Sequence, residues 1–329
     1  NQNLEVKMNF RVIAVFKGLY KVNINGEQKL LGITGNMKKA NEFPVVGDLV
    51  NINETMDVIT GIEPRKTKLS RKVAGNEVIE QILASNIDYV FIVSSLNHDF
   101  NIARLERYLT FVYESGASPV FILTKSDIGE EVEEKINKLE HIAFGVPIYK
   151  ISILDENSLS PIKGYFEKEN IITLVGSSGV GKSTLINKLL GNDVLETQGI
   201  REDDAKGRHT TTHRELFYLG KGAIIDTPGM RELQFWGGDL GNSFEDVETL
   251  ISKCKFSDCT HTNEPKCAIR NAIEIGELSR ERFERYKKLQ KELTFMESKQ
   301  NAGLKRAEKE KIINMMGSLD ARKNLKGKK

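Results

Sequence analysis

Hydrophobic and polar positions change their period twice along this chain of 329 residues. Over residues 9–24, apolar positions alternate loosely and are rich in Val, Phe and Tyr, and short apolar stretches continue over 28–34 and 48–62. A period of two with glycine punctuation predicts short strands, and no helical period is visible before about residue 80. Short strands over roughly 65 residues predict a small β-barrel, for which an OB-fold is the best match.

Apolar runs then alternate with helical periods. Residues 102–115 carry apolar positions at helical spacing, and residues 130–144 predict a second helix whose acidic start suits the helix dipole. Alternating strands and helices indicate a parallel sheet with right-handed crossovers. Four runs have the composition of strands buried on both faces of such a sheet: 89–93, 119–123, 147–151 and 171–175.

The last third of the chain is charged and mostly helical in its period, for example over residues 274–299. We therefore predict a multidomain protein: an OB-fold barrel over 1–70, an α/β P-loop domain over 71–237, and a mostly α-helical domain over 238–329. No apolar run reaches the length of a membrane span, and the N-terminus has no basic head followed by an apolar stretch. We expect a cytoplasmic protein with no membrane contact.

A phosphate-binding loop is indicated by the pattern G-x-x-x-x-G-K-[ST], which follows the apolar run 171–175 and leads into a helical pattern. Its backbone N–H groups would surround the phosphates, Lys182 would contact the β- and γ-phosphates, and Ser183 would ligate Mg²⁺. The alternative is a glycine-rich turn with no ligand. The predicted nucleotide contacts are Gly176, Ser177, Ser178, Gly179, Val180, Gly181, Lys182, Ser183 and Thr184.

A base-reading loop precedes the phosphate loop in the chain. Thr124-Lys125-Ser126-Asp127 follows the run 119–123 and resembles the N/T-K-x-D motif of GTPases, with threonine in place of the commoner asparagine. Asp127 can accept hydrogen bonds from guanine N1–H and the exocyclic amine, which adenine does not offer there. The stem of Lys125 can cover one face of the base. Ser152, in the sequence Ile151-Ser152-Ile153 at the next strand end, is a candidate for a backbone contact to the guanine oxygen, or merely part of a loop.

A third motif, Asp226-Thr227-Pro228-Gly229, resembles the D-x-x-G motif of GTPases. Asp226 would hold Mg²⁺ through water, and the Gly229 N–H would sense the γ-phosphate. In ordinary GTPases the phosphate loop comes before the base reader. The reversed order here predicts a circularly permuted GTPase domain, in which the γ-phosphate sensor comes last and the C-terminal domain follows it directly.

The polar stretch 207–213 lies between these motifs and would complete the Mg²⁺ site through Thr211 or Thr212, which the pattern does not separate. Met230 stands where Ras-like GTPases place a glutamine that orients the attacking water. Methionine cannot do this, so hydrolysis should be slow alone or should use another residue. His209 is a candidate for that catalytic role, although a histidine in such a loop is more often structural or solvated.

The three cysteines of the chain gather near one histidine, in the pattern C-x₄-C-x-H-x₅-C. Three thiolates and one imidazole are the ligand set of a closed, structural, tetrahedral Zn²⁺ site. An odd, clustered set of cysteines without an export signal is a poor disulfide framework. The predicted zinc ligands are Cys254, Cys259, His261 and Cys267.

Charge is informative only locally, because the net charge is +2 and the 29% of charged residues is ordinary. Residues 65–72 hold five basic residues and no acid, and residues 305–329 hold nine basic and three acidic residues. Such runs are either solvated surfaces or contacts for a phosphate backbone.

Taken together, the barrel, TKSD, GSSGVGKST, GRHTTT, DTPG and the Cys/His cluster resemble the bacterial ribosome small-subunit-dependent GTPase A family over nearly the whole chain. The resemblance implies GTP hydrolysis stimulated by the small (30S) ribosomal subunit during its late maturation, with nucleotide state controlling release. It also implies that the OB-fold and the zinc domain contact 16S rRNA. The expected ligands are GTP or GDP with Mg²⁺ and one structural Zn²⁺, and we expect a monomer.

Two other functions remain compatible with parts of the sequence. One is a P-loop enzyme that uses ATP on a small molecule, which Asp127 argues against. The other is a non-catalytic or weakly catalytic RNA-binding scaffold with a regulatory guanine-nucleotide site.

Overall fold

The computed structural model divides into two compact units, which are described separately. The first comprises residues 1–70 and 82–233, and the second comprises residues 71–81 and 234–329. The residues that the structure describes are 10–24, 26–72, 80–97, 99–191, 195, 214–226, 240, 243–295 and 298.

Five strands of the first unit close into a barrel, in the order β1-β2-β3-β5-β4 with β4 paired back to β1. Buried residues alternate along β2, so one face of each strand fills the barrel with side chains such as Val22 and Ile59. A five-stranded closed barrel of this kind confirms the predicted OB-fold. Its elements are β1 (Phe10–Val15), β2 (Tyr20–Ile24), β3 (Glu27–Ile33), α1 (Gly35–Ala40), β4 (Leu49–Ile52) and β5 (Val58–Ile62).

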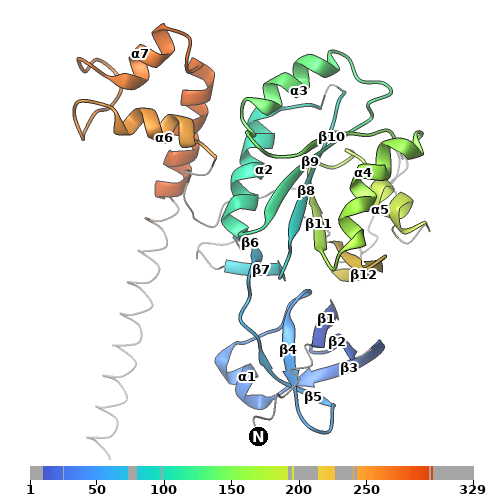
Figure 1. Ribbon diagram of the computed structural model, residues 1–329. Helices are drawn as coiled ribbons and strands as arrows, with labels where there is room; N and C mark the ends of the chain where they lie inside the picture. Colours follow the sequence, from blue (N-terminus) through green and yellow to red (C-terminus); the bar gives the residue numbers. More distant parts are fainter. Residues whose placement is uncertain are drawn as a thin grey trace, which may run out of the picture. The chain divides into compact units, whose positions relative to one another are not determined.

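The second part of this unit is a sheet in the order β10-β9-β8-β11-β13-β12, parallel except for β12. Strands occur at all four predicted apolar runs, and their side chains enter separate cores on the two faces of the sheet. Helices α2 and α3 cover one face and α4 and α5 the other (Figure 1). The strands are β8 (Tyr89–Ser95), β9 (Ser118–Thr124), β10 (Ile148–Lys150), β11 (Ile171–Val175), β12 (Glu215–Leu219) and β13 (Gly222–Asp226).

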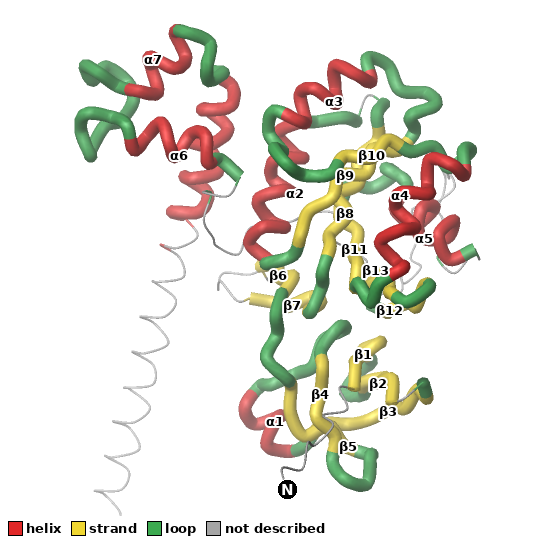
Figure 2. Tube along the Cα trace, viewed as in Figure 1, coloured by secondary structure: helices red, strands yellow, loops and turns green. Residues whose placement is uncertain are grey.

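One helix of this layer is shorter than the sequence predicts. The helix predicted over 130–144 spans only Val132–Glu140. Its late start follows from Glu131, whose left-handed φ of 51° is incompatible with the helix. The strands form the centre of the layer in Figure 2, with helices at both sides. The helices are α2 (Ile102–Ser115), α3 (Val132–Glu140), α4 (Ser160–Lys163) and α5 (Lys182–Leu190), with short 3₁₀ turns η1 (Glu156–Leu159) and η2 (Gly164–Glu167).

Strand β1 of the barrel pairs antiparallel with β12, so the barrel and the α/β domain share one continuous sheet. Two further strands, β6 (Lys68–Lys72) and β7 (Glu80–Ser85), pair with each other.

The second unit is mostly helical, as predicted. It contains α6 (Glu245–Ser252), α7 (Ala268–Glu274) and a helical stretch over residues 280–295. Their apolar faces form one core that includes Phe244, Ile269 and Tyr286. Within the described ranges, no helix has the length and apolar character that crossing a membrane requires.

Candidate nucleotide and metal sites

The phosphate loop connects the buried strand β11 to the start of α5 at Lys182, as the sequence predicts. Gly176 has a φ of 147°, and a Cβ atom there would lie 2.2 Å from the Val93 carbonyl oxygen of β8. Gly181, the residue just before the helix, has a φ of 97°. Only glycine fits both positions without strain, and the loop can therefore approach the backbone of β8 closely.

Lys182 and the first turn of α5 place positive charge at the phosphate loop. The Lys182 ammonium donates hydrogen bonds of 2.6 Å to the carbonyl oxygens of both Gly176 and Ser177. Its charge is thus held across the loop, beside the positive end of the helix dipole. Ser183 and Thr184 lie in the same first turn.

The base-reading loop is joined to the phosphate loop by side chains. The Thr124 hydroxyl donates to the Val180 carbonyl oxygen at 2.7 Å, and Lys125 Nζ donates to the Gly179 carbonyl oxygen at 3.2 Å. Threonine therefore makes the connection at the position where asparagine is commoner. Asp127 follows on the exposed side of the loop.

The candidate guanine-oxygen loop lies against the base-reading loop. Ser126 N–H donates to the Ile151 carbonyl oxygen at 3.2 Å, and Ser152 is buried. The loops that precede the phosphate loop in the sequence are thus brought to the same edge of the sheet, at the carboxyl ends of its parallel strands, where α/β proteins bind ligands.

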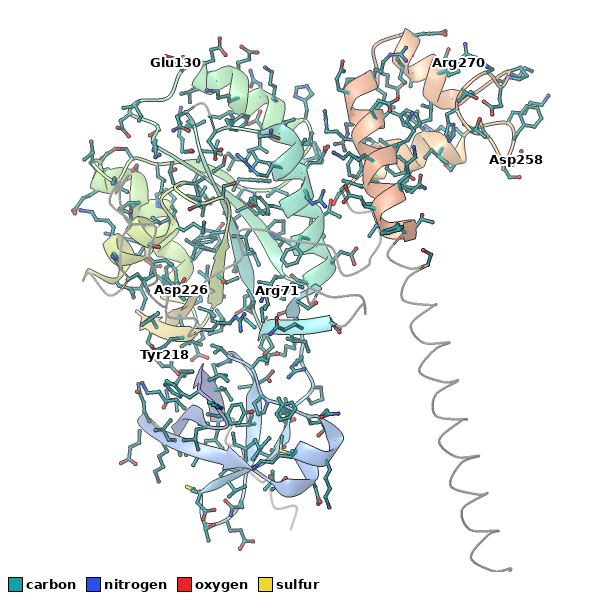
Figure 3. The ribbon with its side chains drawn as sticks, turned by 180° about the vertical axis from the view of Figure 1, so that it is seen from behind. Arg71, Glu130, Tyr218, Asp226, Asp258 and Arg270 are labelled. Atoms are coloured by element: carbon teal, nitrogen blue, oxygen red, sulfur yellow. The ribbon has the colours of Figure 1, made fainter. Side chains whose placement is uncertain are left out.

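The predicted γ-phosphate side is described only in part. Asp226 ends β13, the neighbour of β11, and Figure 3 shows it together with Tyr218 of β12. The neighbouring Ile225 carbonyl oxygen accepts a 2.8 Å hydrogen bond from Thr173 of β11, which fixes the two strands together. His209, Thr211, Thr212 and Gly229 lie outside the described residues.

Two contributors to this edge have no signal in the sequence. Ser158 of η1 bonds the backbone of Ser152, and Glu156 forms a 2.9 Å ion pair with Lys188 of α5. A serine three residues after Asp155 is an ordinary turn pattern, and nothing in this pattern predicts that Ser158 bonds the backbone of Ser152.

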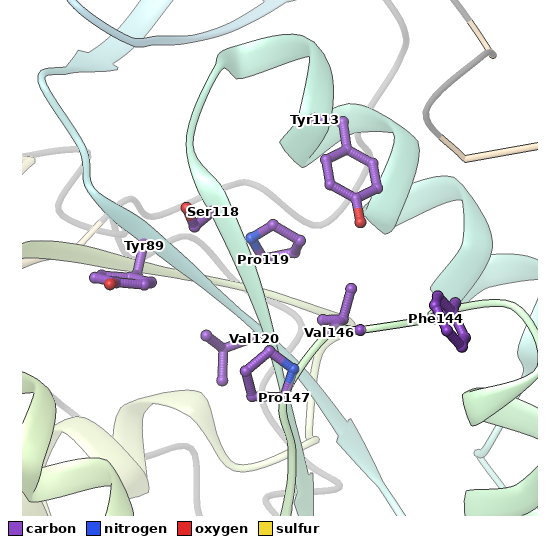
Figure 4. A pocket seen from close by; sticks show the side chains of 9 residues that line it. Tyr89, Tyr113, Ser118, Pro119, Val120, Phe144, Val146 and Pro147 are labelled. Atoms are coloured by element: carbon purple, nitrogen blue, oxygen red, sulfur yellow. The ribbon is translucent and has the colours of Figure 1, made fainter. Parts of the chain in front are cut away.

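A pocket of about 230 Å³ lies elsewhere, at the amino ends of β8 and β9 (Figure 4). Its walls include Tyr89, Pro119, Phe144 and Pro147. It opens at the end of the strands opposite to the phosphate loop, and so it plays no part in the nucleotide site.

The four residues of the C-x₄-C-x-H-x₅-C pattern converge in the second unit. Their ligand atoms all lie within 4.8 Å of one another, so the cluster could hold one metal ion. Nδ1 of His261 lies 3.6 Å from Sγ of Cys254 and 3.5 Å from Sγ of Cys267. His261 lies in a left-handed turn with a φ of 58°.

The acidities of these groups depend on their surroundings. Burial lowers the pKa of His261, which favours the neutral imidazole that binds metals. Burial would raise the pKa of Cys254, but hydrogen bonds from the N–H groups of Ala268 and Ile269 at the start of α7, together with those of the Cys259 and Cys267 thiols, outweigh it and lower the pKa. Burial and the neighbouring thiols raise the pKa of Cys259 to about 11. A cation among the three sulfurs would relieve their mutual repulsion and favour the thiolates.

The order and geometry of these motifs define the class: this is a circularly permuted P-loop GTPase. Among solved structures, the chain is similar to YloQ, described as a circularly permuted GTPase, with a TM-score of 0.63 and 25% identity over 91% of this chain and 98% of that one. It is also similar to YjeQ from Thermotoga maritima, with a TM-score of 0.65 and 27% identity over 87% of this chain and 98% of that one.

The chain belongs to the RsgA GTPase family, whose model matches residues 62–236. It is 43% identical to "Small ribosomal subunit biogenesis GTPase RsgA 2" of Lactiplantibacillus plantarum, over 96% of this chain and 91% of that protein. It is 42% identical to "Small ribosomal subunit biogenesis GTPase RsgA" of Methanosarcina acetivorans, over 97% of this chain and 88% of that protein. These findings confirm the resemblance predicted from the motifs.

Proposed function

We propose that the protein hydrolyses GTP during the late maturation of the small ribosomal subunit, with its nucleotide state controlling release from 16S rRNA. The observation that carries the proposal is the joining of two loops at one sheet edge. Thr124 and Lys125 each donate a hydrogen bond to the backbone of the phosphate loop, which supports a single site for base reading and phosphate binding. The names of the relatives supply the ribosomal partner.

In this mechanism, guanine is selected by Asp127, and the phosphates are held by the backbone N–H groups of residues 176–184. Lys182 would exchange its bonds to Gly176 and Ser177 for the β- and γ-phosphates, and its charge would stabilise the transition state. Ser183 and Asp226 would hold Mg²⁺, which neutralises charge on the phosphates when bound. Gly229, Thr211 or Thr212, and His209 remain candidates for sensing the γ-phosphate and positioning water.

We also propose that the Cys/His cluster holds one structural Zn²⁺. A tetrahedral ion with typical Zn–S and Zn–N bonds separates sulfur from nitrogen by about 3.6 Å. The separations of 3.6 and 3.5 Å around His261 fit that value. All four ligands come from the protein, so the ion would support the fold of the second unit and not the reaction.

The test is GTP turnover by the purified protein with and without small ribosomal subunits, alongside ATP. We expect stimulation by the subunits, no comparable ATP turnover, and loss of GTP turnover in Lys182→Ala. Turnover that the subunits do not change would disprove the ribosomal part of the proposal. ATP competing with labelled GDP as well as GTP does would favour the ATP-dependent enzyme, and Lys182→Ala that fully supports ribosome maturation in cells would favour the scaffold.

A further inference from the structure

The loop after β10 uses its backbone N–H groups within the protein, with one exception. Among the residues that the structure describes, only the N–H of Ile153 in the stretch 151–155 has no protein partner. The others donate as follows: Ile151 to the Leu123 carbonyl oxygen at 2.8 Å, Ser152 to the Ser158 hydroxyl at 3.1 Å, Leu154 to the Ser152 hydroxyl at 3.2 Å, and Asp155 to the Ser152 carbonyl oxygen at 3.1 Å.

The Ser158 hydroxyl closes this loop. It accepts the Ser152 N–H, and its single proton can go to the carbonyl oxygen of Ser152 at 3.0 Å or of Asp155 at 2.6 Å. The hydroxyl therefore always holds the Ser152 N–H. When its proton points to Ser152, it also holds the carbonyl oxygen of the peptide plane that leads into Ile153, an oxygen to which the Asp155 N–H donates as well.

Ser158 is itself held firmly in place. It lies in η1, where the Asp155 carboxylate accepts the Asn157 N–H at 3.0 Å and the next residue, Leu159, is fully buried. The Glu156–Lys188 ion pair adds a contact to α5, which starts at the phosphate loop. The hydroxyl is thus a fixed point from which the loop can be oriented.

We propose that Ser158 is a positioning residue for guanine: through Ser152, it holds the Ile153 N–H toward the oxygen at position 6 of the base. The inference rests on the proposed function. An N–H at this place favours guanine, because adenine presents an amine there, and two donors would face each other. Ser152 lies beside the base-reading loop through the bond between Ser126 N–H and the Ile151 carbonyl oxygen.

The test combines one substitution with changes in the base. Ser158→Ala would remove the hydroxyl, and dissociation constants would be measured for GDP, inosine diphosphate and 6-thioguanosine diphosphate. Inosine keeps the oxygen at position 6, whereas thioguanosine replaces only that atom by sulfur, a weak acceptor. We expect affinity to fall about tenfold for GDP and inosine diphosphate, as for loss of one well-made hydrogen bond, and less than threefold for the thio analogue.

Ser160→Ala is the matched control, since Ser160 is exposed and only two residues away. It should leave all three affinities unchanged, and Ser158→Thr, which keeps the hydroxyl, should restore discrimination. Equal losses for all three nucleotides would show a merely structural role and overturn the inference, as would no loss at all. A wild-type protein that does not prefer GDP to ADP would instead overturn the proposed function.

Discussion

The barrel shares its sheet and its buried charges with the GTPase domain, whereas the second unit has a core and ion pairs of its own. Between barrel and GTPase domain, Asp48 accepts hydrogen bonds from Arg65 at 2.7 Å and from Ser85 of β7 at 2.5 Å. Gly47 packs so closely that a Cβ atom would lie 2.0 Å from the Ser85 carbonyl oxygen. The OB-fold is therefore part of the GTPase domain's own structure and not an independently attached module.

The second unit is stabilised by a buried arginine and its own ion pair. Arg282 is 8% exposed and donates to both carboxylate oxygens of Asp246, at 2.7 and 2.8 Å. Its guanidinium also lies 4.7 Å from the centre of the Phe244 ring. These contacts and the Cys/His cluster stay within residues 243–295, so this unit should unfold separately from the first.

The largest loss of stability is expected when the metal is removed from the second unit. Cys259→Ser, or a strong zinc chelator, should unfold the second unit, because structural zinc contributes on the order of 10 kcal/mol to small zinc domains. Differential scanning calorimetry should show its transition lost and that of the first unit unchanged, with about one zinc per chain found in the wild type by elemental analysis. Ser257→Ala, which is exposed and beside the cluster, is the control. A single transition that shifts as a whole would contradict the separate unfolding of the two units.

The next largest loss of stability is expected from a substitution at the buried junction between the barrel and the GTPase domain. Asp48→Asn keeps the shape of the side chain and removes the charge that faces Arg65. Loss of one partner from a buried pair costs about 3–5 kcal/mol, and we expect about 2 kcal/mol here because Arg65 is 22% exposed. Urea denaturation should show barrel and GTPase domain losing structure together. Glu54→Gln, an exposed carboxylate in the same barrel, should change nothing.

If Asp48→Asn instead produced a separate, earlier transition for the barrel alone, the two parts would not be one cooperative structure, and the shared sheet would be a weak contact.

A smaller effect is expected from the equivalent pair in the second unit. Arg282→Lys keeps the positive charge and loses the paired geometry with Asp246 as well as the planar contact on Phe244. We expect a destabilisation of about 1.5 kcal/mol, smaller than at Asp48 because the Asp246 side chain is 47% exposed and solvent weakens the pair. Only the transition of the second unit should move in calorimetry, and Arg280→Lys on the same helical stretch should be neutral. A shift in the first unit's transition would show that the two units do not unfold independently.

This contrast also shows which features a sequence can reveal. The phosphate loop was predictable because its glycines and Lys182 are spaced by local backbone geometry, and the cysteine cluster because its ligand types are rare elsewhere in the chain. The two faces of the sheet were likewise predictable from apolar runs such as 89–93.

The junction could not be predicted in the same way. Asp48 and Ser85 are 37 residues apart, and neither residue type nor spacing connects them. The late start of α3 depends on one left-handed residue, Glu131, whose type does not require that conformation. Ser158 acts through its partner and not through a motif. Features made by tertiary contact leave little trace in local pattern, whereas those made by backbone geometry or ligand chemistry leave a clear one.

The smallest effect should come from the ion pair at the rim of the barrel junction. Lys21 of β2 and Glu215 of β12 lie 3.3 Å apart, with side chains that are 30% and 37% exposed. Solvent and salt screen such pairs, so Lys21→Met should cost at most about 0.5 kcal/mol at low ionic strength and nothing measurable at high salt. The backbone pairing of Ala14 with Glu215 and the buried Asp48 remain in this variant. A loss as large as that of Asp48→Asn, measured by urea denaturation, would mean that the barrel is held by surface charge and not by the shared sheet.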